Sequence, residues 1–308
     1  MKKSRLFIVT LFVCVIAASM VFAAGSKESG SSKHKVYLIT MDQMDQHWVT
    51  VDKGAQKAAT ELGNVDYKWL APDVKDDAKQ IEMINNAIAG GAQAILLAAN
   101  GPTAVTAVLE EANRAGIKII YVDSAADFPG LQTLATDNKA AGTTAGKALI
   151  AELQKNGVAT GSIGIVNVNA ATASTVAREA GFREAFAGTG YTILETQYGD
   201  GDPARSKDIA ANYITQGVVG IFGANEGSTV GTGNAIQEAR KAVVGVGFDK
   251  SDMILSLIRN GHLLATMAQN PDVMGYEGMK SAVKALNGET ISPSYFDTGV
   301  TVLTKSNI

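Results

Sequence analysis

The side chains best suited to bind a small molecule are carboxylates, carboxamides and aromatic rings that directly follow predicted β-strands. They are Asp42, Asp45, His47 and Trp48 after the first strand, Asp123 and Ser124 after the fourth, Thr172 after the sixth, Asn225 after the eighth, Phe248 and Asp249 after the ninth, and Gln269 after the tenth. Carboxylates accept hydrogen bonds from hydroxyl groups, and carboxamides both donate and accept them. An aromatic ring packs on the apolar face of a sugar. Because the set contains no lysine or arginine, it indicates a neutral, polyhydroxylated ligand.

Each of these residues also has a structural explanation. Asp and Asn after a strand commonly cap the next helix, and Phe248 alternatively belongs to the core. What favours a binding site is their number at one edge, because ligands of doubly wound sheets lie at the carboxyl ends of the strands.

No constellation for catalysis or metal binding accompanies them. The sequence lacks GxxxxGK[ST], HExxH, GxSxG and a GxGxxG after the first strand. His34, His47 and His262 do not have the spacing of metal ligands. We interpret 231–233 (GTG) as close helix packing, and 200–202 (DGD) as a turn and helix cap rather than a calcium loop. We therefore expect a binding protein, not an enzyme, with no cofactor and no metal.

The elements that must position these residues alternate along the chain, which predicts an α/β fold of two doubly wound parallel-sheet lobes. The predicted strands are nearly continuous apolar runs, as expected for strands buried on both faces. They cover 36–40, 66–70, 94–98, 118–123, 131–135, 162–167, 191–197, 218–222, 243–247, 264–268 and 300–303. The predicted helices cover 47–62, 77–89, 103–115, 139–155, 173–187, 204–216, 228–240, 250–260 and 272–286.

Composition sets limits on the class of protein. The chain has 308 residues, of which 46% are hydrophobic and 19% charged, and this balance is typical of a globular protein. The 27 basic and 30 acidic residues give a formal charge of −3. Without a basic surplus to neutralise phosphates, the chain is not expected to bind nucleic acid.

The N-terminal segment has the three parts of a secretory signal peptide. Lys2, Lys3 and Arg5 precede an apolar run from Leu6 to Met20, and small residues follow at Ala23 and Ala24. We predict a signal peptide over 1–23, because the apolar run is shorter than the roughly 20 residues of a membrane-spanning helix. The mature protein is then expected in the periplasm.

The residues around the cleavage point support a soluble mature protein. The segment 24–33 is rich in Gly, Ser and Lys, which predicts a flexible leader. Cys14, the single cysteine, is alternatively a lipidation site, but it lies inside the apolar run and would be removed with it. Loss of three basic residues leaves 24 basic against 30 acidic residues, a net charge of −6.

Four segments carry a resemblance to a known family. They are 53–59 (KGAQKAA), 178–182 (REAGF), 244–249 (VGVGFD) and 265–271 (ATMAQNP). At these residues the chain resembles periplasmic sugar-binding proteins of the ribose/galactose type, whose fold is shared by the effector domains of the lactose-repressor family. The resemblance covers about 36–303. It implies two lobes joined by three crossing segments near 136/137, 269/270 and 297/298, with the sugar in the cleft. Lobe 1 would then comprise 34–136 and 270–297, and lobe 2 would comprise 137–269 and 298–308.

The resemblance also implies roles for individual residues. Asp45 matches the family's first polar ligand, His47 and Trp48 match two aromatic positions, and Asp123, Asn225, Asp249 and Gln269 match further ligands. Asp42, Ser124, Thr172 and Tyr198 are secondary candidates.

The sequence departs from ribose binders at several of the family's positions. Ser124 stands where ribose binders carry an arginine, Val176 aligns with their second-lobe arginine, and Tyr198 is the ring nearest to an aromatic position that aligns near Gly201. A hexose, cyclitol or other polyol therefore fits as well as ribose. Arg205 is the alternative source of positive charge for the site.

The resemblance predicts a monomeric solute-binding protein whose lobes close on a sugar or polyol and which delivers it to an ABC permease of the inner membrane. The alternative is a sensory protein that presents a sugar-like signal to a membrane receptor such as a chemoreceptor. A secreted enzyme is a third hypothesis, but no nucleophile or metal constellation supports it.

Overall fold

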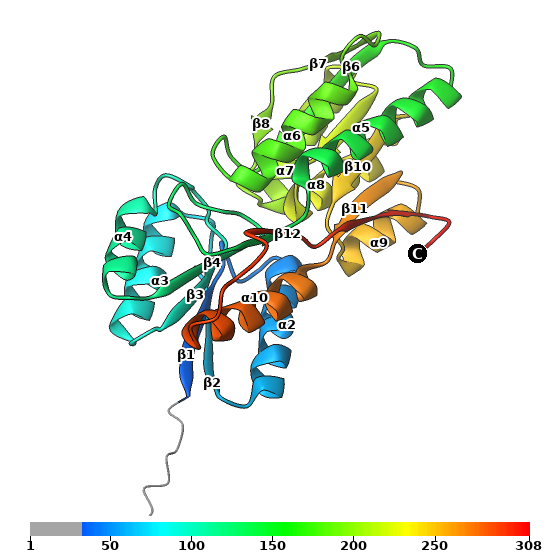
Figure 1. The fold of residues 1–308 in the computed structure, drawn as a ribbon. Helices are drawn as coiled ribbons and strands as arrows, with labels where there is room; N and C mark the ends of the chain where they lie inside the picture. The colour runs from blue at the N-terminus through cyan, green and yellow to red at the C-terminus, as the bar shows by residue number, and fades with distance from the viewer. Residues whose placement is uncertain (1–32) are drawn as a thin grey trace, which may run out of the picture. The chain divides into compact units, whose positions relative to one another are not determined.

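The computed structural model describes residues 33–308, so the predicted signal peptide and nearly all of the predicted leader lie outside the described residues. Strands and helices alternate from residue 34 onward, and the strands form two separate sheets. We call the six-stranded sheet and its helices lobe 1, and the seven-stranded sheet and its helices lobe 2 (Figure 1). No helix of the described part combines the length and hydropathy needed to cross a membrane.

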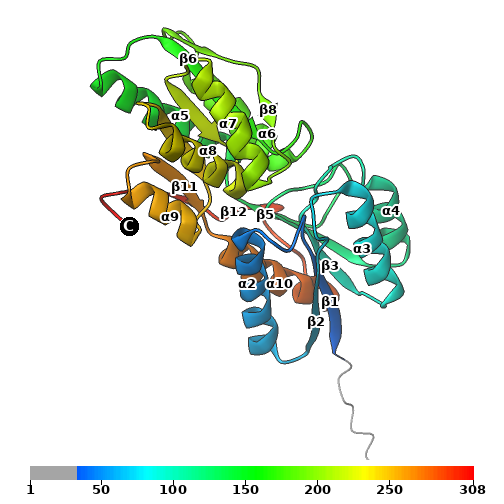
Figure 2. The same cartoon turned by 180° about the vertical axis from the view of Figure 1, so that it is seen from behind.

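The sheet of lobe 1 has the strand order β12-β5-β4-β3-β1-β2, and every pair in it is parallel. Its strands are β1 (His34–Ile39), β2 (Val65–Leu70), β3 (Ala94–Leu97), β4 (Lys118–Val122), β5 (Thr133–Ala135) and β12 (Tyr295–Asp297). Its helices are α2 (Gln46–Leu62), α3 (Asp77–Ala89), α4 (Thr106–Arg114) and α10 (Pro271–Leu286). Residues of α2 and α10 pack on one face of the sheet, and residues of α3 and α4 pack on the other. Figure 2 shows α2 beside α10.

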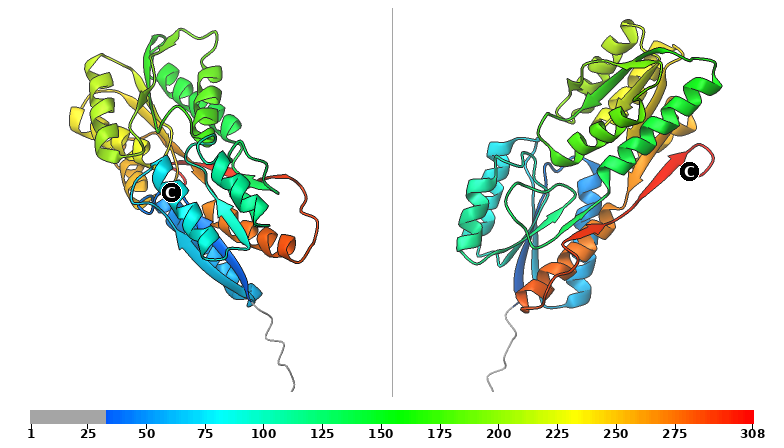
Figure 3. Two further views of the ribbon diagram at one scale, coloured as in Figure 1. Left: turned by 90° about the vertical axis from the view of Figure 1, so that its left-hand side faces the viewer. Right: turned by 45° about the horizontal axis from the view of Figure 1, so that its top comes forward.

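The sheet of lobe 2 has the order β13-β11-β10-β9-β6-β7, with β8 paired to β6. Its strands are β6 (Gly161–Asn167), β7 (Tyr191–Ile193), β8 (Gln197–Tyr198), β9 (Gly220–Gly223), β10 (Val244–Phe248), β11 (Ala265–Gln269) and β13 (Val300–Thr304). Its helices are α5 (Asn138–Lys155), α6 (Ala173–Ala185), α7 (Pro203–Thr215), α8 (Glu226–Ala239) and α9 (Asp252–Arg259). The last strand, β13, runs antiparallel beside β11, as the right-hand view of Figure 3 shows in red and orange.

The chain passes between the two sheets three times. It does so between β5 and α5, between β11 and α10, and between β12 and β13. Because α10 and β12 return to lobe 1 before β13 returns to lobe 2, both lobes are built from separate stretches of sequence.

Most predicted elements coincide with observed ones, and two differences have clear physical reasons. The predicted strand 191–197 is in fact two short strands, β7 and β8, because only its two ends pair with β6. The sequence prediction missed β12, a three-residue edge strand whose Tyr295 and Asp297 are exposed. A strand this short and this exposed has no apolar alternation to detect.

The two glycine- and aspartate-rich motifs have the structural roles expected of them. A Cβ at Gly231 would lie 2.7 Å from the carbonyl oxygen of Pro203, so this glycine lets α8 approach α7 closely. The carboxylate of Asp202 accepts a hydrogen bond from the backbone N–H of Arg205 at 2.7 Å and caps α7. Among residues 33–308 there is no cluster of His, Cys, Asp and Glu able to hold a metal ion.

Candidate functional site

The carboxyl ends of the strands from both lobes meet at a small inner pocket. Its lining includes eight of the predicted site residues: Asp45, His47, Trp48, Asp123, Thr172, Asn225, Asp249 and Gln269. Its volume is only 20 Å³, which accommodates about one water molecule and no sugar ring. The convergence predicted from the strand ends is therefore present, and the space between these residues is filled by side chains.

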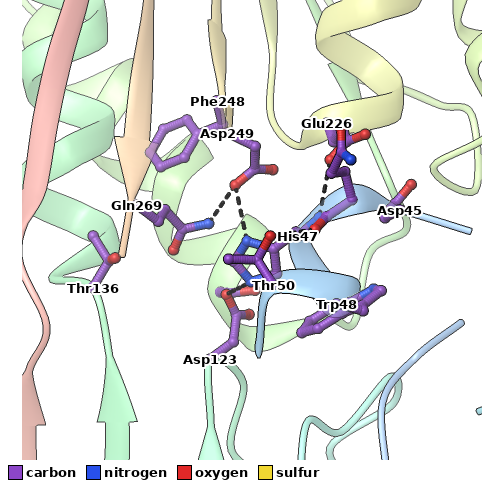
Figure 4. Close-up of polar contacts among 12 residues, drawn as sticks. Asp45, His47, Trp48, Thr50, Asp123, Thr136, Glu226, Phe248, Asp249 and Gln269 are labelled. Atoms are coloured by element: carbon purple, nitrogen blue, oxygen red, sulfur yellow. Dashed lines mark hydrogen bonds and ion pairs between the residues drawn. The ribbon is translucent and has the colours of Figure 1, made fainter. Parts of the chain in front are cut away.

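His47 occupies the centre of the pocket (Figure 4). It lies in the first turn of α2 in lobe 1, and its side chain is 6% exposed. Its Nε2 is 3.2 Å from Oδ2 of Asp123, which follows β4 of the same lobe. Its Nδ1 is 3.4 Å from Oδ1 of Asp249, which follows β10 of lobe 2. One imidazole thus links the carboxylates of the two lobes.

The carboxylates of Asp123 and Asp249 determine the charge of this imidazole. Burial alone would lower the pKa of His47, but the contacts with Asp123 and Asp249 raise it to about 10. Burial likewise opposes ionisation of the two aspartates, yet His47 and the nearby Arg178 hold the pKa of each below its usual value. At neutral pH the three groups are an imidazolium between two carboxylates.

Asp123 and Asp249 share an unusual backbone conformation. Their φ angles are +64° and +72°, in the left-handed region that Asp and Asn adopt more readily than most other residues. Asp249 also accepts a 2.6 Å hydrogen bond from Nε2 of Gln269, the last residue of β11. Asp249 does not cap the following helix, because Ser251 is the N-cap of α9 and accepts from the backbone N–H of Ile254.

Arg178 corrects the prediction that the site contains no arginine. Its side chain is 2% exposed and reaches the pocket from α6. Its Nε donates to Oδ1 of Asn138 at 2.7 Å, its Nη1 donates to the carbonyl of Ala224 at 3.0 Å, and its Nη2 lies 3.6 Å from Asp123. The guanidinium stacks 4.2 Å from the ring centre of Phe248.

Lys75 is the second cation that the sequence prediction missed. It lies in the loop between β2 and α3, and its side chain is 7% exposed. Its Nζ is 2.7 Å from Oδ2 of Asp45 and 2.5 Å from Oδ2 of Asp42. Burial raises the pKa of Asp45 and works against the ionisation of Asp42, but Lys75 keeps the pKa of Asp42 below its usual value. The acidic residues after β1 are therefore already balanced within lobe 1.

Glu226 adds a carboxylate that was not among the predicted site residues. It is the first residue of α8, and its Oε2 accepts a 3.2 Å hydrogen bond from the backbone N–H of His47. Burial, together with the charges of Asp45 and Asp249, raises the pKa of Glu226 to about 7. Its charge therefore varies near neutral pH.

The remaining predicted residues divide into those that face the pocket and those that support it. Asn225 lines the pocket, but its Oδ1 caps α8 through Ser228 N, which leaves its amide N–H₂ for a ligand. Thr172 donates to the carbonyl of Asn100 across the lobes at 2.7 Å.

Four predicted residues do not line the inner pocket. Asp42 accepts from the indole N–H of Trp48 at 3.1 Å. The hydroxyl of Ser124 lies 2.9 Å from Oδ1 of Asp123 and 2.6 Å from the hydroxyl of Ser174. Phe248 is fully buried beneath Arg178, and Tyr198 is 38% exposed on β8. Arg205, the alternative counter-charge, is paired with Asp200 on the exposed surface.

A larger outer cavity of 330 Å³ adjoins the inner pocket. The two cavities share His47, Asp249 and Gln269, so these three side chains form the wall between them. The other residues that line the outer cavity are Gln46, Thr50, Lys250, Ser251, Asp252, Leu255, Asn270, Pro271 and Asp272.

The chain belongs to the periplasmic binding protein domain family, whose model matches residues 36–290. It is 29% identical to the ribose import binding protein of Haemophilus influenzae, over 90% of this chain and 94% of that protein. It is 26% identical to the D-allose-binding periplasmic protein of Escherichia coli, over 85% of this chain and 87% of that protein.

Solved structures agree with this assignment. A carbohydrate transporter solute-binding protein from Agrobacterium radiobacter in complex with D-arabinose superposes with a TM-score of 0.86 at 29% identity, over 90% of this chain and 96% of that chain. An ABC transporter solute-binding protein from Agrobacterium vitis bound to α-D-tagatopyranose gives 0.84 at 30% identity, over 89% of this chain and 95% of that chain. The predicted family and the predicted fold of two α/β lobes are thus confirmed. The family is one of solute-binding transport proteins, as expected for a binding protein and not an enzyme.

Proposed function

We propose that this protein binds one neutral monosaccharide or polyol in the inner pocket, between its two lobes. The observation that carries the proposal is the convergence of buried carboxylates and carboxamides from both lobes on one point. Asp123 comes from lobe 1, whereas Asn225, Asp249 and Gln269 come from lobe 2. The named relatives support the same class of ligand, since these proteins bind ribose, D-allose, D-arabinose and tagatose.

The hydrogen-bonding capacity of the pocket fits hydroxyl groups. Asp123 and Asp249 accept two or more hydrogen bonds each, and a sugar hydroxyl can donate to them in place of His47. Among the described residues, Nη2 of Arg178 and Oε1 of Gln269 are buried polar atoms without a hydrogen-bond partner. A hydroxyl group satisfies both kinds of atom, because it donates and accepts. Trp48 supplies the ring surface, and we place Asp45 among the ligand contacts, together with His47 in the wall shared with the outer cavity.

The charge of the site favours a neutral ligand. The site contains five carboxylates and three basic side chains. The carboxylates are those of Asp42, Asp45, Asp123, Glu226 and Asp249, and the basic side chains are those of Lys75, Arg178 and His47. Each basic side chain is already paired with at least one carboxylate of the protein. An anionic ligand would therefore have to be desolvated without a cation of its own, which is costly.

The first experiment identifies the ligand. A thermal-shift screen would cover D-ribose, D-allose, D-arabinose, D-fucose, D-tagatose, D-glucose and myo-inositol, followed by calorimetry of each compound that raises the Tm. A ligand at 100 times its Kd stabilises the protein by about 2.7 kcal/mol. A screen in which no sugar or polyol raises the Tm overturns the proposed function.

The second experiment tests charge selectivity. Calorimetry would compare D-galactose with D-galacturonic acid, and D-ribose with D-ribose 5-phosphate. We expect each anion to bind at least tenfold more weakly than its neutral partner. Equal or tighter binding of the anions would show that Arg178 or Lys75 leaves its carboxylate partner to bind the ligand.

We also propose that the protein acts in the periplasm as a monomer and passes its ligand to an inner-membrane ABC permease. Support comes from the solved relatives described as ABC transporter and carbohydrate transporter solute-binding proteins. Uptake of the radiolabelled ligand in cells with and without this protein tests the proposal. Uptake that is unchanged by deletion, together with a lost response to the ligand, would favour the sensory alternative.

A further inference from the structure

The imidazole of His47 occupies the position that the proposed function gives to ligand hydroxyls. Its two nitrogens face the carboxylates of Asp123 and Asp249, one from each lobe, at 3.2 and 3.4 Å. The pocket that remains around it has a volume of 20 Å³. A sugar and this ring conformation therefore exclude each other.

We propose that His47 is a built-in occupant of the ligand site: it joins the two lobes in the ligand-free protein, and a sugar must displace it to bind. This inference rests on the proposed function for the identity of the displacing ligand, but the histidine bridge itself is tested separately, on the protein without added sugar. The ligand must then replace two ion-pair contacts of the imidazolium at once. It needs two hydroxyl donors placed to reach Asp123 and Asp249 together, as in a diol of a monosaccharide or cyclitol.

The structure offers a place for the displaced ring. His47 lines both the inner pocket and the 330 Å³ outer cavity. Rotation of its side chain toward Gln46 and Thr50 would move the imidazole into the outer cavity and free the space between the aspartates. The backbone of α2 need not move, because the N–H of His47 stays bonded to Glu226.

The groups around His47 determine how the bridge depends on pH. They are Asp45 at the start of α2, Asp123 after β4, Asp249 after β10, Glu226 on α8, Arg178 on α6 and Lys75 in the loop before α3. Four of these are carboxylates and two are cations, and the carboxylates of Asp123 and Asp249 lie 3.2 and 3.4 Å from the ring nitrogens. In the bridge the pKa of His47 is raised to about 10.

The direction of the pH effect follows from this shift. A displaced imidazole in the outer cavity leaves Asp123 and lies among Lys250, Asp252 and Asp272, so its pKa falls from about 10 toward the ordinary value of about 6.5. Ligand binding therefore releases a proton between about pH 7 and pH 9, and affinity rises with pH over that range. Release of one proton lowers Kd by at most about tenfold per pH unit. Below about pH 6 the imidazole is protonated in both positions, so Kd no longer depends on its titration.

The first test uses the ligand-free full chain. NMR of the histidine ring protons would follow all three histidines from pH 5 to 9, with the His47 signal assigned by its absence in His47→Phe. We expect His47 to remain protonated at pH 8. Small-angle scattering at pH 7 should give a larger radius of gyration for His47→Phe than for the natural protein. A His47 that loses its proton below pH 8, or equal radii, would overturn the bridge.

The second test uses D-arabinose as the probe, with calorimetry at pH 6, 7, 8 and 9. The natural protein and the control His262→Phe should show a Kd that falls severalfold per pH unit above pH 7. His47→Phe keeps a ring of similar size without N–H groups, and its Kd should vary less than twofold.

A further variant separates the two titrating groups. Because the pKa of Glu226 is raised to only about 7, its contribution ends near pH 8, so Glu226→Gln should retain the slope between pH 8 and 9. An unchanged slope in His47→Phe would overturn the inference. If neither D-arabinose nor any other sugar of the panel binds, the proposed function fails. The NMR and scattering results still show whether His47 bridges Asp123 and Asp249.

Discussion

Two buried charge clusters flank the inner pocket, and they are built in opposite ways. The lobe-1 cluster, Lys75 with Asp42 and Asp45, comes from two loops of one lobe. The bridging cluster, His47 with Asp123 and Asp249, takes its second carboxylate from the other lobe. The ion pairs of the lobe-1 cluster do not depend on contact between the lobes, whereas those of the bridging cluster form only while the lobes are in contact. We infer that the lobe-1 cluster stabilises the fold and that the bridging cluster responds to the ligand.

The largest effect is expected from the lobe-1 cluster. Lys75→Met would leave two buried carboxylates without their cation, which typically destabilises a protein by about 3–5 kcal/mol. Urea unfolding measured by circular dichroism gives the loss of free energy. The control Lys79→Met breaks the exposed pair with Asp73 and should change stability little. Equal losses for the two variants would show that burial of Lys75 does not matter.

The second effect concerns binding through the bridging cluster. Asp249→Asn preserves the left-handed backbone but removes a charged acceptor, and loss of a charged partner at a buried site costs about 2–5 kcal/mol of binding. We expect Kd for the sugar found in the screen to rise at least tenfold, measured by calorimetry. Asp208→Asn, on the exposed side of α7, should bind as the natural protein does. An unchanged Kd in Asp249→Asn would remove Asp249 from the proposed site.

The smallest effect separates capping from binding at Asn225. Asn225→Ala and Asp76→Ala each remove a helix N-cap, and each should lower stability by about 1 kcal/mol. Only Asn225 lies in the inner pocket, so only its variant should also weaken sugar binding. Unfolding and calorimetry on both variants check this. Equal affinities would limit Asn225 to its structural role.

Local signals in the sequence were sufficient for most of the fold. Asp202, predicted to be a helix cap, caps α7, and the helix predicted over 47–62 ends at Gly63, whose φ of +72° closes α2. What failed was pairing that depends on distant residues. The short strands β8 and β12 form because β6 and β5 offer them hydrogen-bonding edges, and nothing in their own few residues encodes this.

The sequence predicted the site residues that directly follow strands, and it missed those that lie elsewhere. Asp123 and Asp249 directly follow strands, so their convergence could be inferred. Arg178 lies within a helix, and its burial depends on Asn138 and Ala224, which are distant in sequence. Lys75 lies in a loop whose path no periodicity describes. The excess of acids after β1 was the one available signal that a buried cation must be near.

The path of the C-terminal segment has a consequence for the order of folding. Met274 and Met279 of α10 are fully buried in the core of lobe 1 against α2, and β13 completes the edge of lobe 2 beside β11. Neither lobe can therefore complete its fold before the C-terminal segment is available. The two lobes are completed together, once the last segment is available for folding, and a truncated product lacking residues from 271 onward would expose the apolar face of α2 and be open to aggregation.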